Sequence, residues 1–426
     1  MIKKRIASMI ALVLAVALVL PTGAFAAPSY TTTVDAGTST GAIKYGGIGW
    51  LYGLSSDTQP KSSDISGVYH PGYAGQMAPD GAQHPDGDAF KVTANAKRGG
   101  IKGIDIYMQD FYSEWPYQNN GITSYVNNVI KPTAQKVVAS SDRSYYRYVL
   151  FNEPDWIWYA PSGSKFTQFC NDWKTAYQAL RSVDSSGKII GPAFCTYSAS
   201  AYDAFFKFAK DNNCLPDITA WHELSAQGPT PFDSNYSNYR SIESKYGISA
   251  REVYINEYGR QTGEMARPGR MIQYLARFEK AKVWAGMAAW GKIGYLDDLI
   301  GTDNKQTGGY HLYRWYGQMA GNTVSLTNSD STGCNQAMAC RNGGNNVKVI
   351  FGGSLYDSDV YTQTVKVNGL SGSSVPYTIY GTDYTTTEKL AYTVSSGTAT
   401  ISGGTATITV PNCKSLSAYM VQMGSW

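Results

Sequence analysis

Two glutamates stand where a pair of carboxylates could do chemistry. Glu153 lies in the segment Phe151-Asn152-Glu153-Pro154 and Glu257 in Ile255-Asn256-Glu257-Tyr258, and each follows a short apolar run that predicts a buried strand. Pro154 lacks the N–H needed to continue strand pairing, so Glu153 is expected at a strand end. A carboxylic acid and a nucleophilic carboxylate about 5–5.5 Å apart can cleave a glycosidic bond with retention of configuration. The sequence thus points to glycosidic bond chemistry.

Strand and helix patterns alternate from about residue 140 to 320, and they must position these glutamates. Between Phe166 and Leu180, apolar residues recur every three or four positions, which predicts one face of an amphipathic helix. Repeated strand–helix units indicate a parallel sheet, and in a barrel the strand C-termini converge on one face. Seven strands are predicted directly, and 73–77 is assigned to complete a barrel of eight. The predicted strands are 46–54, 73–77, 102–108, 148–152, 188–194, 217–222, 252–257 and 285–290.

The composition changes after residue 320. Residues 321–426 are rich in Ser, Thr, Gly and Val, and alternating runs such as Val347–Phe351 are separated by turn pairs such as Gly403-Gly404, a pattern typical of a β-sandwich. We therefore predict an α/β fold, a (β/α)₈ TIM barrel with a C-terminal β-sandwich. The predicted divisions are a signal peptide at 1–26, an N-terminal β segment at 27–45 that joins the sandwich, the catalytic barrel at 46–320 and the sandwich at 321–426.

The first residues carry the features of an export signal. Lys3, Lys4 and Arg5 precede the apolar run Met9–Leu20, and small residues follow at 24–26. The run is too short to span a bilayer, which needs roughly 20 residues. We expect cleavage after Ala26 and secretion, with no membrane attachment afterwards. The alternative is a buried N-terminal helix.

The charge and the aromatic content of the chain indicate which kind of molecule it binds. The 36 Lys and Arg of the chain include three in the export signal, and they face 32 Asp and Glu, so the remainder is close to neutral. Nucleic-acid binding is not expected, because it needs clustered Lys and Arg. Ten Trp and 33 Tyr supply flat rings with polar edges, which suit stacking on sugars. These features favour a carbohydrate substrate.

No metal or cofactor is expected. The six cysteines form no CxxC or Cys/His array, and the close spacing of Cys334 and Cys340 favours a disulfide between them. Asp80, Asp86 and Asp88 could ligate Ca²⁺ through hard oxygens, but a solvated loop is the favoured interpretation.

The strand end Asn152-Glu153-Pro154, followed much later by the strand-end Glu257, resembles the 4/7 superfamily (clan A) of glycoside hydrolases. The early β segment, barrel and C-terminal sandwich most resemble glycoside hydrolase family 39, and residues 309–316 are similar to that group's last barrel helix. Tyr258-Gly259, after Glu257, departs from the family, many of whose members carry Trp there. The resemblance implies Glu153 as acid/base and Glu257 as nucleophile.

Further roles follow from the same resemblance. Asn152 resembles the Asn that hydrogen-bonds the sugar 2-hydroxyl, and His222 lies where relatives place a His or Tyr beside the nucleophile. Trp290 lies where relatives stack an aromatic ring under the sugar. Trp115 and Trp156, in predicted loops on the same face, are candidate sugar platforms; packing of these loops on each other is the alternative.

Together these features predict a secreted retaining glycoside hydrolase that degrades an oligo- or polysaccharide by double displacement. Glu153 is expected to be protonated at rest, its pKa raised by the second carboxylate and by partial burial, and Glu257 to be ionised. The alternatives are a secreted sugar-binding barrel without hydrolysis and a transglycosylase. Xylosides, arabinosides, galactosides, uronides and exopolysaccharides remain open as substrates, as does the oligomeric state.

Overall fold

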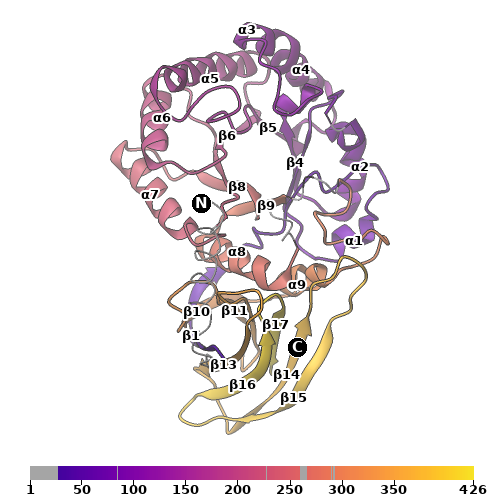
Figure 1. Cartoon of the computed structure of the whole chain (residues 1–426), viewed down its shortest axis with the longest axis vertical. Coiled ribbons are helices and arrows are strands. Elements are labelled where there is room, and N and C mark those ends of the chain that lie inside the picture. The colour runs from indigo at the N-terminus through magenta and orange to yellow at the C-terminus, as the bar shows by residue number, and fades with distance from the viewer. Residues whose placement is uncertain (1–26, 84, 227, 260–265, 289, 291–292) are drawn as a thin grey trace, which may run out of the picture.

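Eight short parallel strands close into a barrel ringed by helices (Figure 1). The computed structural model describes residues 27–426 apart from 84, 227, 260–265, 289 and 291–292, so the predicted signal peptide at 1–26 lies outside the described residues. The strands are β2 (Trp50–Leu51), β3 (Tyr73–Met77), β4 (Gly103–Tyr107), β5 (Tyr146–Val149), β6 (Lys188–Phe194), β7 (Ile218–Glu223), β8 (Glu252–Tyr258) and β9 (Trp284–Ala288). The predicted barrel is confirmed, including the strand at 73–77.

The barrel helices bury one apolar face each. In α5, Phe166, Phe169, Cys170, Trp173 and Leu180 are buried, as the spacing predicted. Within the described residues, no helix combines the length and apolar character needed to cross a membrane. The helices are α1 (Ser62–Ser66), α2 (Ala89–Gly99), α3 (Ile122–Tyr125), α4 (Lys131–Ala139), α5 (Gly163–Val183), α6 (Ala199–Asp211), α7 (Phe232–Lys245), α8 (Pro268–Ala281) and α9 (Gly308–Gly317).

The remaining strands form one nine-stranded sheet that folds over a core of its own. β1, the first described strand, lies between β10, to which it is antiparallel, and β13, to which it is parallel. The order is β15-β14-β17-β12-β11-β10-β1-β13-β16. The bounds are β1 (Ser29–Ala42), β10 (Asn322–Asn328), β11 (Gln336–Arg341), β12 (Val347–Gly352), β13 (Val360–Asn368), β14 (Ser374–Thr382), β15 (Tyr392–Thr400), β16 (Ala406–Lys414) and β17 (Ala418–Met423).

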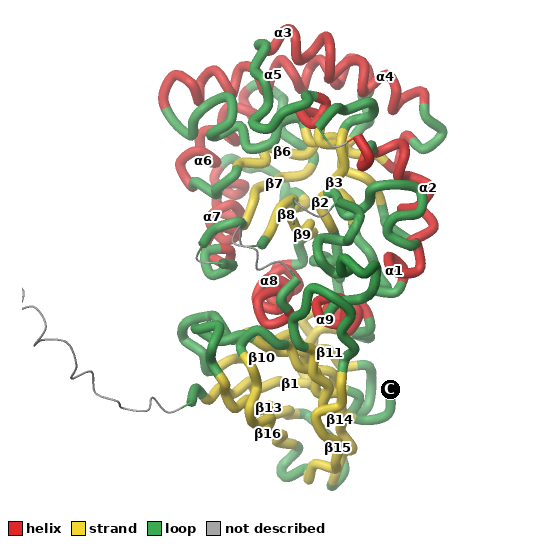
Figure 2. The backbone as a smooth tube through the Cα atoms, turned by 45° about the vertical axis from the view of Figure 1, so that its right-hand side comes forward, coloured by secondary structure: helices red, strands yellow, loops and turns green. Residues whose placement is uncertain are grey.

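Helices α8 and α9 join the barrel to the sheet (Figure 2). Met338, Ile350 and Met420 of the sheet belong to the same apolar core as the barrel helices. The approach is close, because a Cβ on Gly269 of α8 would lie 1.9 Å from the Ser415 carbonyl oxygen, and one on Gly308 of α9 would lie 1.6 Å from that of Asp383. The sheet therefore supports the two helices that follow β8 and β9.

Three expectations from the sequence are wrong in detail. β2 contains two residues rather than the nine of 46–54. β5 ends at Val149 rather than Asn152, level with the point where β4 gives way to a short 3₁₀ helix at Met108–Phe111. All six cysteines are free; Cys340 is buried in the core against the barrel helices while Cys334 lies in the loop before β11.

A buried ion pair links neighbouring strands inside the barrel wall. Arg147 of β5 pairs in register with Asp105 of β4, and its Nε and Nη2 donate to the two carboxylate oxygens at 2.5 and 2.8 Å. The guanidinium also lies 3.2 Å from the centroid of the Tyr73 ring. Both charged side chains are almost inaccessible to solvent, so each depends on the other.

We expect Arg147→Ala to lower the free energy of unfolding by about 3–5 kcal/mol, because it leaves the Asp105 carboxylate buried without a counterion. Lys207→Ala, which removes the exposed pair with Asp211, is the control and should cost no more than about 0.5 kcal/mol. Urea unfolding followed by circular dichroism measures both. A similar loss in the two variants would contradict the assigned role of Arg147.

Candidate active site

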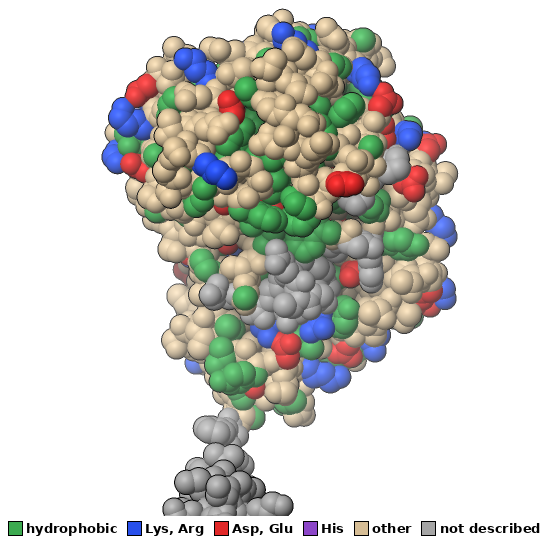
Figure 3. Space-filling view, turned by 45° about the horizontal axis from the view of Figure 1, so that its top comes forward, with side chains coloured by type: hydrophobic (Ala, Val, Ile, Leu, Met, Phe, Trp, Pro, Cys, Tyr) green, Lys and Arg blue, Asp and Glu red, His purple; other side chains and the backbone are tan. Residues whose placement is uncertain are grey.

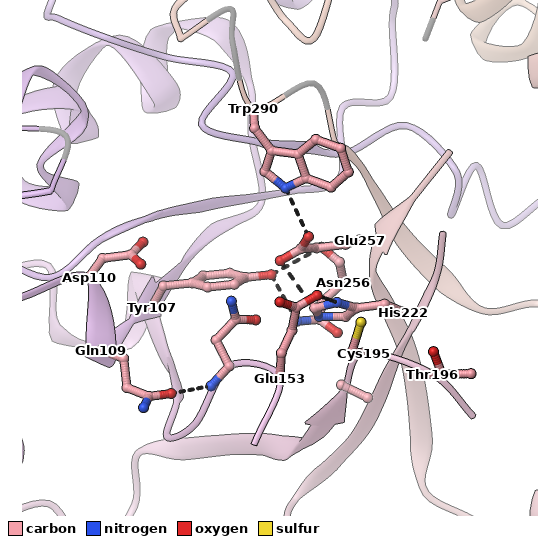
Figure 4. A network of polar contacts seen from close by, with 12 residues as sticks. Tyr107, Gln109, Asp110, Glu153, Cys195, Thr196, His222, Asn256, Glu257 and Trp290 are labelled. Carbon is pink, nitrogen blue, oxygen red and sulfur yellow. Dashed lines mark hydrogen bonds and ion pairs between the residues drawn. The ribbon is translucent and has the colours of Figure 1, made fainter. Parts of the chain in front are cut away.

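Three buried side chains meet at the carboxyl ends of the barrel strands (Figure 4). Glu153 follows β5, the fourth barrel strand, while His222 lies in β7 and Glu257 in β8, the sixth and seventh. His222 lies between the glutamates, with Nδ1 3.2 Å from Oε1 of Glu153 and Nε2 3.6 Å from Oε1 of Glu257. One donor atom of each residue lies within 4.8 Å of the others. In the described part of the chain, this is the one group of His, Cys, Asp and Glu that converges closely enough to hold a metal ion.

The backbone around Glu153 is strained in a way that aims its side chain. Glu153 has φ +48° and Ala193, on β6, has φ +58°, a region that costs a non-glycine residue about 1–3 kcal/mol. The Glu153 N–H donates to the Ala193 carbonyl at 3.0 Å, and the Asn152 N–H donates to Oε1 of Gln109 at 2.5 Å. These bonds hold the two residues beyond the end of β5.

A cavity of about 400 Å³ opens beside the glutamates. His222 is not among its lining residues; its side chain is fully buried. The amide oxygens of Asn152 and Gln83 are buried and have no hydrogen-bond partner among the residues that the structure describes, so both are available there as acceptors. On the face drawn in Figure 3, hydrophobic side chains gather near the centre and charged ones are scattered toward the edges. The cavity is lined by Tyr52, Gln83, Trp115, Tyr117, Asn152, Glu153, Trp156, Glu257 and Trp290.

Each of the two glutamates accepts a hydrogen bond from a tryptophan indole. Trp290 Nε1 donates to Oε2 of Glu257 at 3.1 Å, and Trp156 Nε1 donates to Oε2 of Glu153 at 3.2 Å. Trp115 contacts Trp156 edge to face, with ring centroids 5.2 Å apart. The structure therefore brings all seven residues singled out in the sequence to one site, six lining the cavity and His222 beneath; sugar stacking by the tryptophans stays a prediction.

The pKa values of the two glutamates shift in the opposite directions from those expected. Burial raises the pKa of Glu257 to about 8, and the charge of Glu153 adds to this, although His222 opposes it. Burial also raises the pKa of Glu153, but the hydrogen bond and charge of His222, with hydrogen bonds from Cys195 and Trp156, lower it below its ordinary value. Although burial lowers the pKa of His222, the charges of Glu257 and Glu153 raise it overall. The directions of these shifts favour the proton on Glu257 over Glu153 and favour the charged form of His222.

Asp110 is a site residue that the sequence analysis missed. It is fully buried and accepts hydrogen bonds of 2.6 Å from the hydroxyls of Tyr52 and Tyr117. Burial raises its pKa to about 7, although both bonds lower it. Asn152 Nδ2 in turn donates to the Tyr117 oxygen at 3.3 Å, so Asp110 orients the Asn152 amide through Tyr117. Its position just after β4 was the available signal, the same one that identified Glu153.

Other acidic side chains have structural partners. Glu223 accepts hydrogen bonds from Trp221 and from Asn235 of α7, which places it outside the cavity. Asp88 caps α2, and Asp80 pairs with Lys136. These contacts give Asp80 and Asp88 partners within the protein.

Comparisons with known proteins agree with this geometry. Residues 106–284, which include both glutamates, match the family model described as glycosyl hydrolase catalytic core. A 3-O-β-L-arabinopyranosyl-α-L-arabinofuranosidase of Bifidobacterium pseudocatenulatum is 30% identical over 82% of this chain, and a 3-O-α-D-galactosyl-α-L-arabinofuranosidase of Bifidobacterium longum subsp. longum is 29% identical over 84%. The chain spans 40% and 35% of the length of these relatives.

Solved structures share the whole architecture. N2152 from Neocallimastix frontalis has a TM-score of 0.85 at 28% identity, over 93% of this chain and all of that one. The glycoside hydrolase family 39 enzyme of Xanthomonas axonopodis pv. citri has a TM-score of 0.65 at 10% identity, over 96% and 100%, which is a likeness of fold.

The barrel, the two converging glutamates and the match of residues 106–284 to a glycosyl hydrolase catalytic core are those of a glycoside hydrolase. Within that class, both curated relatives named above are α-L-arabinofuranosidases, and the predicted resemblance to family 39 stays a resemblance of fold and layout.

We expect His222→Gln to move the pH profile of kcat/KM to higher pH. The His222 cation lowers the pKa of both glutamates; without it both hold protons to higher pH, so the acid and alkaline limbs both rise, by about 1–3 pH units. Initial rates on an aryl glycoside between acid and alkaline pH give the profile. The exposed His70, changed to Gln, is the control; an unmoved or lowered profile in His222→Gln would contradict this electrostatic role.

Asp110→Asn should lower kcat/KM by about tenfold or more, because a hydrogen bond to a charged group contributes about 1.5–3 kcal/mol.

The effect of Asp110→Asn on stability should depend on pH. The folded pKa of about 7 exceeds the ordinary 3.8, so wild-type stability from this group falls as pH rises between these values, whereas Asn does not titrate. The Tm of the variant relative to wild type should therefore be more favourable at pH 8 than at pH 4; a constant difference would exclude the buried, titrating carboxyl.

Proposed function

We propose that this chain is a secreted, retaining α-L-arabinofuranosidase acting on an oligo- or polysaccharide. The single observation that carries the retaining mechanism is the separation of the carboxylates: one oxygen of Glu153 lies within 4.8 Å of one of Glu257. Retention needs the carboxyl groups about 5–5.5 Å apart, whereas inversion needs about 6.5–9.5 Å to seat a water between them. The short separation supports direct attack by a glutamate.

The choice of glycosidic bond rests on the relatives. Both curated names specify an α-L-arabinofuranosidase whose arabinofuranosyl unit carries a 3-O-glycosyl group. The cavity of about 400 Å³ falls within the usual range for small-ligand sites. The basic head and apolar run before residue 27 support export.

In the first step Glu257 attacks the anomeric carbon while Glu153 gives a proton to the leaving oxygen, and a glycosyl ester forms on Glu257. In the second, Glu153 takes a proton from water, which attacks the anomeric carbon and releases Glu257. The first step needs the proton on Glu153, whereas the directions of the pKa shifts favour it on Glu257. Transfer of this proton from Glu257 to Glu153, one oxygen of each lying within 4.8 Å of the other, meets this need, and His222, which contacts both carboxylates, keeps its own protons.

The activity is tested on 4-nitrophenyl α-L-arabinofuranoside and on an α-L-arabinofuranoside substituted at O3, with the matching β-D-xyloside and α-D-galactoside for comparison. The arabinofuranosides should be cleaved, and NMR of the first sugar released should show the anomer of the substrate. Turnover of the other glycosides alone would overturn the substrate assignment. Binding without turnover of any of them would favour a sugar-binding protein.

The two glutamates are separated by azide rescue. Glu257→Ala should abolish turnover, and azide should give a glycosyl azide of inverted configuration, because it replaces the nucleophile. Glu153→Ala should retain activity only on aryl glycosides with good leaving groups, and azide should give a product of retained configuration, because it attacks the glycosyl ester. Glu223→Gln, a buried glutamate outside the cavity, is the control and should keep its activity. Full activity of Glu153→Ala on a saccharide would contradict the assignment.

A further inference from the structure

The two ends of the cavity differ, and the difference sets the direction in which a substrate lies. The acid must contact the glycosidic oxygen, so the group that leaves with this oxygen extends past Glu153. Trp156 donates directly to that carboxylate. Trp290 donates to Glu257, which must contact the anomeric carbon. The arabinosyl unit therefore lies on the Trp290 side, and the leaving group on the side of Trp156 and Trp115.

Trp115 and Trp156 remain accessible to an unusual degree. Their exposed fractions are 50% and 47%, although both line the cavity. Their edge-to-face contact, with planes at 70°, covers part of each ring only. About half of each residue therefore stays accessible despite this contact, as expected of a ligand-binding patch.

The loops that carry these two rings are held in place from below. Trp158 Nε1 donates to the Tyr117 carbonyl at 2.9 Å and so ties one loop to the other. Tyr117 is anchored on the buried Asp110, and the Trp158 ring contacts Phe151 and Tyr125 edge to face. The exposed indoles therefore project from a fixed base, which reduces the entropy lost when a ligand binds.

We propose that Trp115 and Trp156 form the subsite for the leaving-group sugar, a neutral saccharide ring that stacks its C–H face on the indoles. This inference rests on the proposed function and adds the orientation of the substrate. Among the described lining residues, the acidic groups are the two glutamates and no Lys or Arg is present, so the described lining provides no counterion for an acidic sugar.

The same subsite accepts a sugar in the second step. A hydroxyl of the bound saccharide then takes the place of water: its proton goes to Glu153, its oxygen bonds to the anomeric carbon, and the ester bond to Glu257 breaks. Transfer to sugars should accordingly accompany hydrolysis when saccharide is abundant.

Trp115→Ala tests the subsite, because Trp115 has no hydrogen bond to either glutamate. On an α-L-arabinofuranosyl trisaccharide we expect kcat/KM to fall roughly tenfold, whereas on α-L-arabinofuranosyl fluoride, whose leaving group has no ring, it should stay within about twofold. Trp115→Tyr should restore most of the loss. Tyr356→Ala removes an exposed ring on the sheet domain and is the control. Equal losses on both substrates, or no loss on the trisaccharide, would overturn the proposal.

Two further measurements separate this inference from the proposed function. With added galactobiose, the ratio of transfer to hydrolysis on the fluoride should fall several-fold in Trp115→Ala. Titration of the unreacted protein with galactobiose, arabinobiose and xylobiose, followed by tryptophan fluorescence, needs no turnover and should show weaker binding in the variant. If wild type cleaves neither arabinofuranoside, the proposed function fails; if all three disaccharides bind wild type and variant alike, or bind neither, the subsite fails.

Discussion

Two carboxylates buried within 4.8 Å of each other repel strongly, and the site depends on the charge between them. His222 is fully buried, contacts both glutamates and has its pKa raised by their charges. Its charge lowers the pKa of both glutamates and so favours an ionised carboxylate in the site.

The surrounding fold serves to keep these groups in place. Glu153 lies on backbone with a positive φ, held by the Ala193 carbonyl, while Gln109 holds the neighbouring Asn152. On the opposite side, the nine-stranded sheet packs on α8 and α9, the helices that follow the strands leading to Glu257 and Trp290. The barrel interior is closely packed. It can therefore hold the strained backbone at Glu153 in place, while the sheet supports the helix that follows Glu257.

Asp110 is a buried carboxyl whose hydrogen bonds position other residues of the site. Its carboxyl fixes the Tyr52 and Tyr117 hydroxyls, and Tyr117 orients Asn152 and, through Trp158, the loop of Trp156. One buried acid thus bears on both the Asn152 amide and the exposed indole pair. A carboxyl with a pKa of about 7 opposes folding as it ionises, a cost in stability that positioning at functional sites often carries.

The spacing of apolar residues and the positions of residues that end strands determined the barrel, its strand order and the location of the two glutamates. Parallel strands bring their C-termini to one face whatever the details of packing. The strand at 73–77 followed from the need to close the barrel. Local pattern contained no information on which buried donors surround each glutamate. His222, Cys195 and Trp156 come from three different segments, and only their convergence lowers the pKa of Glu153. The same holds for β5, whose end at Val149 lies level with the end of the neighbouring β4. Hydrogen-bond partners and charges distant in sequence act through space, and so the tertiary structure alone decided them.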